Sequence, residues 1–410
     1  MACFFLLIVI SVFGFDWVKL IIALAIGVVL GYFLVSHIKK VVVFQLIMIG
    51  LVLPKLIPDL YRELMYSRKW MEQPDAIERA VFQKRPNVYV IQPDGYANFL
   101  DLKNSLYNHD NHKFEQFLDV KGFELYDNYR SNYFSTLSSN SSMFSMKHHY
   151  YGNKTLGINP SHNSRDEIVG DNPVLRVFKN NGYKTHLLLQ IPYLLSNRPT
   201  VDFDYCNISL DEVSYISRGF QLQKDLKKDT KLAIENSASE PSFFFIESML
   251  PSHITTHKDS ESSIENEREL YLERLDLANE WLTDLVSFII EKDPDGLIVI
   301  AADHGGYVGL NSSMESQKKI TDELLIHSMF SSVLAIKWPN NTKPKFDKEL
   351  KSSVNLFRTL FAYLSNDDTL MNNLQQDKSY LIIRKGAPTD VYEVIDENNL
   401  VVFKNYELKK

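Results

Sequence analysis

Cysteine is almost absent from this chain of 410 residues, which contains only Cys3 and Cys206. Cys3 lies in an apolar N-terminal stretch and Cys206 is far from it in the sequence. A disulfide framework and a cysteine-ligated zinc site are therefore both excluded. The chain also lacks an excess of positive charge, because the net charge is −7 and no long basic run occurs. We therefore expect no nucleic-acid partner.

Long uncharged apolar runs occupy the first 57 residues. They are Met1–Phe15, Leu20–Val35 and Val41–Pro54. A membrane-spanning helix needs roughly 20 residues, and the second and third runs reach this length together with their flanking residues. The first run lacks the basic segment and the small-residue cleavage site of a removable signal peptide. Three adjacent runs favour a membrane region over buried core helices, so we expect two or three transmembrane helices within residues 1–57.

The loop His37–Lys40 (HIKK) gives this membrane region an orientation. Basic loops remain on the cytoplasmic side of a membrane. Everything after about residue 58 is then expected outside the cytoplasm. The sequence thus predicts a multi-pass protein of the cell membrane with a periplasmic or cell-surface domain.

The remaining residues predict a helical connector over 58–84 and one large domain over 85–410. Short β-branched and aromatic runs predict buried strands, at Asn87–Gln92, Lys184–Gln190, Ser242–Glu247, Leu297–Ala302 and Ser332–Lys337. Helical stretches separate them, the clearest being Glu265–Lys292. This alternation predicts an α/β fold with a mostly parallel sheet flanked by helices. The tail Ser379–Lys410 contains three further β-like runs, which we expect to add a hairpin at the sheet edge.

Two acidic motifs follow predicted strands. Asp94 comes directly after Asn87–Gln92, and Asp303-His304-Gly305-Gly306 comes after Leu297–Ala302. Ligands of open α/β sheets bind at the carboxyl ends of the strands. Oxygen and nitrogen ligands together are suited to zinc or manganese. Asp and Gly are also common in turns, so each motif alone is consistent with an acidic turn.

Three segments resemble motifs of the alkaline phosphatase/sulfatase superfamily. Asn87–Tyr96 (NVYVIQPDGY) resembles its first strand and metal-binding acid, Ser131–Ser139 (SNYFSTLSS) its nucleophile segment, and Ala302–Gly305 (ADHG) its late Asp-His-Gly motif. Their order and spacing agree over roughly residues 85–335. With membrane helices ahead of the domain, the chain is similar to lipoteichoic acid synthases and phosphoethanolamine transferases.

The resemblance implies a role for each matched residue. Asp94, Thr136, Asp303 and His304 would bind one divalent metal ion, with magnesium or calcium as alternatives to zinc or manganese. Thr136 would also be the catalytic nucleophile, because a metal lowers the pKa of a weakly nucleophilic hydroxyl. The segment is rich in hydroxyl groups, which often serve as caps and in loops. Ser135, Ser138 and Ser139 therefore remain alternatives.

Two departures from the family pattern matter. Thr136-Leu-Ser-Ser-Asn lacks the proline and arginine of the Cys/Ser-x-Pro-x-Arg segment that sulfatases convert to formylglycine. Phosphoryl transfer is therefore favoured over sulfate-ester hydrolysis. His253 stands where the family has a substrate-binding histidine, and His257 is a weaker candidate. Glu247 occupies a position where the family often has histidine. His148, His149, His162 and Arg165 are further polar residues to which we assign no role from the sequence.

These observations predict a membrane-anchored, metal-dependent phosphotransferase or phosphodiesterase. Its substrate would be a membrane lipid or an envelope glycan, with Thr136 carrying the transferred group. One alternative is a sulfatase-like hydrolase of sulfate or phosphate esters. Another is a non-catalytic membrane scaffold that keeps the fold.

Overall fold

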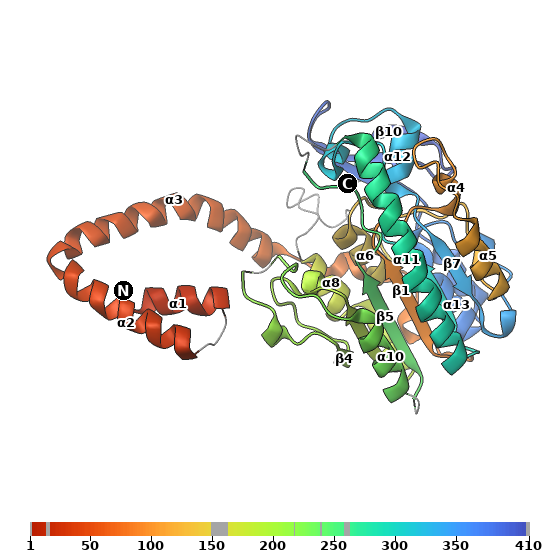
Figure 1. Cartoon of the computed structure of the whole chain (residues 1–410), viewed down its shortest axis with the longest axis horizontal. Helices are drawn as coiled ribbons and strands as arrows, with labels where there is room; N and C mark the ends of the chain where they lie inside the picture. The colour runs from red at the N-terminus through yellow and green to blue at the C-terminus, as the bar shows by residue number, and fades with distance from the viewer. Residues whose placement is uncertain are drawn as a thin grey trace.

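A seven-stranded sheet forms the centre of the molecule (Figure 1). The computed structural model describes residues 2–13, 17–148, 163–216, 218–237, 240–257 and 263–406. The strand order is β2-β7-β6-β1-β5-β3-β4. The strands are β1 (Val88–Pro93), β2 (Glu124–Leu125), β3 (Lys184–Leu189), β4 (Tyr205–Cys206), β5 (Ser242–Ser248), β6 (Leu297–Ala301) and β7 (Leu334–Lys337).

The predicted α/β fold with a mostly parallel sheet is confirmed. Strand β1 pairs in parallel with β5 and with β6, and β3 pairs in parallel with β5 and β4. Only β7 is antiparallel to its neighbours, β6 and β2. All six residues of β1 are buried, as is usual for a central parallel strand covered on both faces.

Helices cover both faces of the sheet. Alternate strand residues point to opposite faces, so each strand contributes to two hydrophobic cores. Val88 and Val90 of β1 join the hydrophobic core on one face, whereas Tyr89 and Ile91 join the core on the other. The first face is covered by α6 (Thr136–Ser145), α8 (Ser164–Val169), α9 (Pro173–Asn180) and α13 (Leu356–Ser365). The second is covered by α4 (Phe99–Leu102), α5 (His112–Val120), α10 (Leu226–Asn236), α11 (Ile264–Lys292) and α12 (Glu323–Phe330).

The C-terminal β-strands form their own sheet rather than a hairpin at the edge of the main sheet. They are β8 (Ser379–Ile383), β9 (Asp390–Ile395) and β10 (Val401–Asn405), paired antiparallel in the order β10-β9-β8. Tyr380 of β8 forms a parallel bridge to Tyr133, and their rings stack at 6.0 Å. This small sheet therefore packs against the segment that leads into α6.

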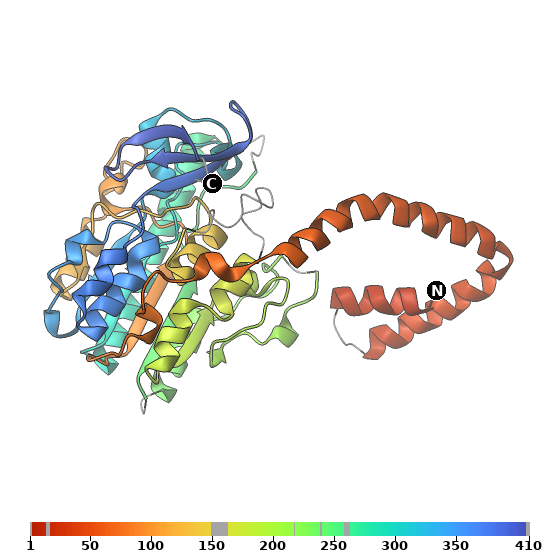
Figure 2. The same ribbon diagram turned by 180° about the vertical axis from the view of Figure 1, so that it is seen from behind.

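Three helices precede the domain; the last of them projects from it, and the first two fold back beside that helix (Figures 1 and 2). They are α1 (Ala2–Phe13), α2 (Trp17–Leu34) and α3 (Ile38–Met65). At 1.5 Å per residue, α1 is about 18 Å long, which is too short for a hydrocarbon core of about 30 Å. A single 3₁₀ turn, Val35–His37, joins α2 to α3. By length and composition, Trp17–Met65 counts as one candidate membrane span.

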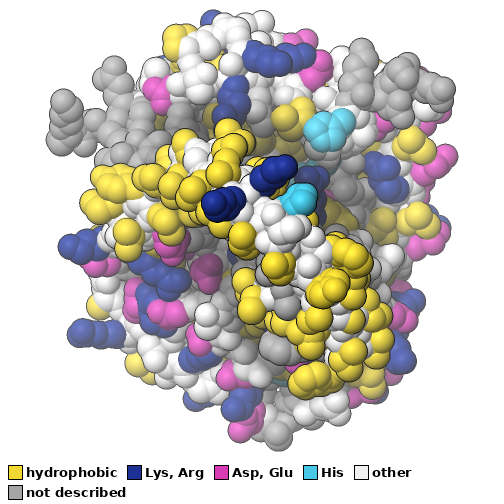
Figure 3. All heavy atoms as spheres, turned by 90° about the vertical axis from the view of Figure 1, so that its left-hand side faces the viewer, with side chains coloured by type: hydrophobic (Ala, Val, Ile, Leu, Met, Phe, Trp, Pro, Cys, Tyr) yellow, Lys and Arg dark blue, Asp and Glu magenta, His cyan; other side chains and the backbone are white. Residues whose placement is uncertain are grey.

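The multi-pass topology predicted from the sequence is therefore not supported, because the described helices include only this one candidate span. Helix α3 also continues beyond residue 57 to Met65. After it, the expected connector consists of two short 3₁₀ turns, Arg68–Met71 and Ile77–Arg79. Seen from the end of these helices, hydrophobic side chains dominate their surface, with basic and histidine side chains near the centre of the view (Figure 3).

Candidate active site

The carboxyl ends of β1 and β6 bring Asp94 together with Asp303 and His304. The His304 Nε2 atom lies 3.6 Å from Asp94 Oδ1 and 3.3 Å from Asp303 Oδ2. One ligand atom from each residue lies within 4.8 Å of the others, and all three residues are buried. Over 200 positions separate Asp94 from the other two residues, so the parallel pairing of β1 with β6 creates this cluster.

Backbone contacts fix the turn that carries Asp94. The Asp94 amide donates to the Ser248 carbonyl, and the Ser252 amide donates to the Asp94 carbonyl, both at 2.8 Å. Gly95 follows with φ +67°, and a Cβ there would lie 2.8 Å from the Ser252 backbone. Its amide donates to Asp303 Oδ1 at 3.2 Å. Only glycine combines this conformation with this close approach, and the turn holds the two aspartates in register.

The electrostatics of the cluster fit a bound cation. Burial raises the pKa of the Asp303 carboxyl, with His304 opposing the shift and Asp94 adding to it. Asp303 Oδ2 has no hydrogen-bond partner among the described residues. The Nδ1 atom of His304 pairs with the Gly305 carbonyl at 2.9 Å, which leaves Nε2 for a ligand. Two carboxylates and one imidazole are a ligand set for zinc or manganese.

Thr136 occupies the first position of α6 and faces this cluster. Its Oγ1 donates to Asp94 Oδ1 at 3.3 Å. The alternative hydroxyls have other partners: Ser135 Oγ pairs with Ser138 Oγ at 3.2 Å, and the buried Ser139 donates to the Tyr133 carbonyl at 2.9 Å. The free N–H groups of a helix N-terminus also favour an anion at this point.

His253 lies on the other side of His304, with ring centroids 5.7 Å apart. Burial lowers the pKa of His253 to about 4, so its imidazole is neutral near pH 7. Its Nδ1 pairs with the Ile254 carbonyl, which leaves Nε2 available. His257, in contrast, is exposed. His148 is buried between Tyr133 and the Gln376 carbonyl, where it has a structural role.

Tyr307 is a site residue that the sequence did not reveal. Its ring lies 5.4 Å from that of His304 and 5.6 Å from that of His253. Its hydroxyl donates to the Phe134 carbonyl, two residues before Thr136. Its φ of +63° is strained for a residue with a bulky side chain. A tyrosine three residues after an Asp-His pair carries no recognisable signal, so only the fold exposes this role.

A second polar group lies beside the cluster. Glu247, the penultimate residue of β5, pairs with Gln92 of β1, and neither side chain has a hydrogen-bond partner among the described residues. Burial raises the pKa of Glu247, and Asp303 and Asp94 add to the shift. Arg165 of α8 opposes it electrostatically, and its Nε donates to the Tyr193 carbonyl at 2.8 Å. Arg165 therefore supplies a cation next to the site, whereas His149 and His162 lie outside the described residues.

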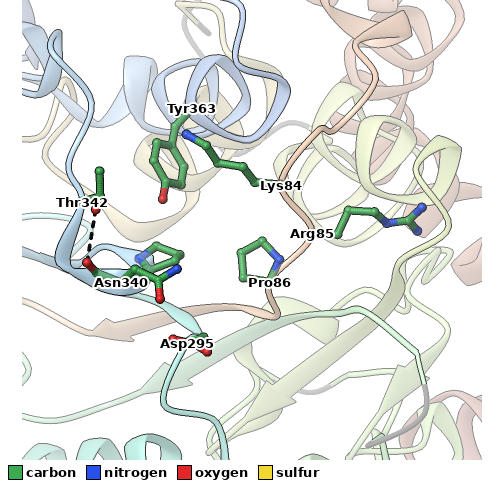
Figure 4. Close-up of a pocket in the computed structure, with 8 residues that line it drawn as sticks. Lys84, Arg85, Pro86, Asp295, Asn340, Thr342 and Tyr363 are labelled. Atoms are coloured by element: carbon green, nitrogen blue, oxygen red, sulfur yellow. Dashed lines mark hydrogen bonds between the residues drawn. The ribbon is translucent and has the colours of Figure 1, made fainter.

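A surface hollow at the opposite ends of the strands contains none of these groups (Figure 4). Pro86 and Asp295, which line it, precede β1 and β6, so the hollow lies at the amino ends of these strands. Thr342 Oγ1 donates to the Asn340 carbonyl there at 3.2 Å. Because α/β sheets bind ligands at the carboxyl ends of their strands, we assign no catalytic role to this hollow.

Comparison with known proteins finds similar solved structures only. The chain is similar to the C-terminal periplasmic domain of phosphoethanolamine transferase EptC from Campylobacter jejuni, with 15% identity, a TM-score of 0.46, and coverage of 69% of this chain and 90% of that one. It is similar to the integral membrane lipooligosaccharide phosphoethanolamine transferase A from Neisseria meningitidis, with 13% identity, a TM-score of 0.46, and coverage of 85% and 68%. It is also similar to the lipoteichoic acid synthase LtaP from Listeria monocytogenes, with 14% identity, a TM-score of 0.48, and coverage of 82% and 91%.

No protein-family model and no curated protein matches the sequence. The similar structures include both kinds of enzyme that the sequence motifs resemble, phosphoethanolamine transferases and a lipoteichoic acid synthase. With identities below 25% and TM-scores below 0.5, the roles of individual residues rest on the geometry of the site itself.

Proposed function

We propose that the protein is a membrane-tethered, metal-dependent phosphotransferase or phosphodiesterase that acts on an envelope lipid or glycan. One observation carries this proposal: the Thr136 hydroxyl lies at a helix N-terminus, 3.3 Å from Asp94, beside Asp303 and His304. A nucleophilic oxygen, an anion-binding helix end and a metal-ligand set thus share one place. This combination serves transfer of an anionic group.

Two displacements complete the proposed reaction. The Thr136 oxygen attacks the phosphorus of the donor, loses its proton, and forms a phosphodiester with the transferred group. The bond between phosphorus and the donor alcohol breaks, and the departing oxygen takes up a proton. An acceptor hydroxyl, or water in the hydrolytic case, then attacks the same phosphorus and releases the Thr136 oxygen, which regains a proton.

The residues around Thr136 divide the remaining tasks. Asp94, Asp303, His304 and Thr136 would hold a divalent metal ion, which lowers the pKa of a hydroxyl and neutralises charge on the phosphoryl group. Neutral His253 accepts a hydrogen bond through Nε2 from a substrate hydroxyl. Arg165 pairs with a phosphoryl oxygen, a contact to which a guanidinium is well suited.

Helix α3, which we call the tether, supports a substrate in or near a membrane. Helix α3 has 28 residues, so at 1.5 Å per residue it is about 42 Å long and exceeds a hydrocarbon core of about 30 Å. We infer that it crosses once and leaves the catalytic domain outside the cytoplasm. The similar solved structures include lipooligosaccharide and lipoteichoic acid enzymes by name. Sulfate-ester hydrolysis is disfavoured because the formylglycine segment is absent.

A covalent intermediate on Thr136 provides the direct test. Trypsin cleaves after Arg130 and Lys147, so the nucleophile is carried on the peptide Ser131–Lys147. After incubation of the full chain with bacterial membrane lipids and acid quenching, mass spectrometry should find this peptide with a phosphoryl-containing head group on Thr136. The Thr136→Ala variant is the control and should carry no adduct. An unmodified peptide from a preparation that turns over lipid would refute the covalent route.

A further inference from the structure

The loop between β4 and α10 exposes three large apolar side chains within six positions. Tyr215, Ile216 and Phe220 are 47%, 66% and 62% exposed. Single exposed hydrophobic residues are ordinary on protein surfaces, but a cluster on one short loop marks an interaction site. We call these three residues the apolar tip.

An ordered base holds the apolar tip in place. Arg198 donates through Nη1 to the carbonyls of Leu210 and Val213 at 2.6 and 2.7 Å. The Arg198 guanidinium also lies 4.4 Å from the centre of the Tyr215 ring. Val213 is buried, and Gly219 approaches the backbone of Tyr193 so closely that a Cβ would lie 2.5 Å from it. These contacts thus hold the base of the loop that carries the exposed side chains.

A chain of contacts connects the apolar tip with both the tether and the active site. Tyr66, directly after α3, donates to Glu167 of α8. The same helix carries Arg165, which contacts Tyr193, and the Tyr193 ring packs 5.6 Å from the Phe220 ring. The loop lies on the side of the domain from which α3 extends, as both ribbon views show (Figures 1 and 2).

The apolar surface of the tether reaches the domain itself. Leu64 and Met65, in the last turn of α3, are 83% and 53% exposed. A bilayer that covers α3 to this end therefore passes close to the β4–α10 loop. Tyrosine, aliphatic side chains and arginine are the groups that occupy the boundary between lipid tails and head groups.

We propose that Tyr215, Ile216 and Phe220 enter the outer boundary layer of the lipid bilayer beside α3. The inserted loop holds the edge of the active site against the lipid surface, with Arg198 and the exposed Arg218 among the phosphate head groups. The contact between Phe220 and Tyr193 places Arg165 next to this surface. The role in substrate delivery rests on the proposed function, whereas insertion itself does not.

Insertion can be measured without any activity. The full chain with Cys3→Ala is labelled with an environment-sensitive maleimide at Ile216→Cys and, as control, at Val120→Cys, which is 75% exposed on α5. Burial raises the pKa of Cys206 to about 11, so this thiol should stay unlabelled near pH 7. Labelling of the Cys3→Ala parent chain checks this. In lipid nanodiscs, the label at 216 should shift to shorter wavelength and be quenched by brominated lipid, whereas the label at 120 should not. A label at position 216 that stays solvent-like and unquenched in nanodiscs overturns the proposal. This holds even if a protein partner is later found to cover the same position.

Substrate delivery is tested by comparing a bilayer phospholipid with a water-soluble nitrophenyl phosphodiester. Tyr215→Ser/Ile216→Ser should lower lipid turnover by about ten-fold or more, the equivalent of about 1.4 kcal/mol, and leave soluble turnover unchanged. Phe220 is retained because it packs on Tyr193, and Leu100→Ser/Val120→Ser is the matched control. Equal lipid turnover in wild type and variant overturns delivery. If wild type turns over neither substrate, the proposed function fails while the label still decides insertion.

Discussion

The hydroxyl of Thr136 lies 3.3 Å from the carboxylate of Asp94, although 42 positions separate the two residues. Asp94 directly follows the central strand β1 and Thr136 begins α6, so the contact joins a strand end to a helix start. The oxygen of Thr136 therefore points at negative charge. Its deprotonation is opposed unless a cation lies between the two groups, so the proposed nucleophile depends on the proposed metal site.

The first prediction concerns the nucleophile. Thr136→Ala removes the proposed attacking oxygen and little buried volume, so the fold should persist while turnover falls at least about a thousand-fold, since members of a catalytic unit act together. Ser135→Ala and Ser138→Ala serve as controls and should retain activity, because these hydroxyls pair with each other. Turnover of a phosphodiester substrate measures all three variants. Full activity of Thr136→Ala together with loss of activity in one serine variant would assign the nucleophile to that serine. Full activity in all three variants would refute the covalent mechanism.

The second prediction concerns the metal. Asp303→Asn removes one of the two carboxylates of the cluster, so the purified variant should retain substantially less zinc or manganese by elemental analysis. Metal at 100 times its dissociation constant stabilises a folded protein by about 2.7 kcal/mol. Metal should therefore raise the thermal midpoint of wild type but hardly that of the variant.

The exposed Asp276→Asn is the matched control for this experiment. In chelator, Asp303→Asn should melt no lower than wild type, because it relieves repulsion between two buried carboxyls. An unchanged metal content in Asp303→Asn would contradict the shared site.

The sequence predicted the sheet well, because its strands are buried on both faces and appear as short apolar runs. It also indicated Asp94, Asp303 and His304, since ligands follow strand ends in such folds. The membrane region was harder to predict. Apolar runs define length, but only the backbone shows that Val35–His37 is a helical turn between α2 and α3.

Other parts of the site have no local signal. Tyr307 acts through contacts with His253 and Phe134 that its neighbours in sequence do not imply. In the sequence, Arg165 cannot be distinguished from a surface arginine. Only the packing of α8 places it beside Glu247 and Tyr193. For the C-terminal segment, the sequence likewise predicted β-strands but not the separate sheet that they form. Strand pairing in a small sheet depends on tertiary contacts, which the local sequence does not show.

The third prediction concerns topology. A reporter that is active only outside the cytoplasm should be active when fused after Lys410, because α3 is inferred to cross the membrane once. The same reporter fused after Lys40 should be inactive, since the basic residues Lys39 and Lys40 favour the cytoplasmic side. Reporter activity in intact cells, normalised to protein level, is the measurement. Activity of the Lys40 fusion combined with silence of the Lys410 fusion would reverse the orientation.

The final prediction concerns a buried acid, Glu167, that links Tyr66 at the end of α3 to α6, the helix of the proposed nucleophile. Tyr66 and Ser141 of α6 donate to the two carboxylate oxygens of Glu167. Burial raises the pKa of Glu167 from 4.5 to about 7, with Ser141, Tyr66 and Arg68 opposing the shift and Asp166 adding to it. Both hydroxyl donors favour the ionised form, but they do not offset its loss of hydration.

The sign of the resulting pH dependence follows from linkage. Between about pH 4.5 and 7 the folded chain holds a proton on Glu167 that the unfolded chain has released, so stability falls as pH rises through this range and is constant above it. Relative to Glu167→Gln, wild type should lose about 3 kcal/mol across this window, at about 1.4 kcal/mol per unit of pKa. Thermal unfolding of both proteins at half-unit pH steps, with the exposed Glu273→Gln as control, measures the difference. Parallel pH profiles for wild type and Glu167→Gln would show that Glu167 does not titrate in the folded protein in this range.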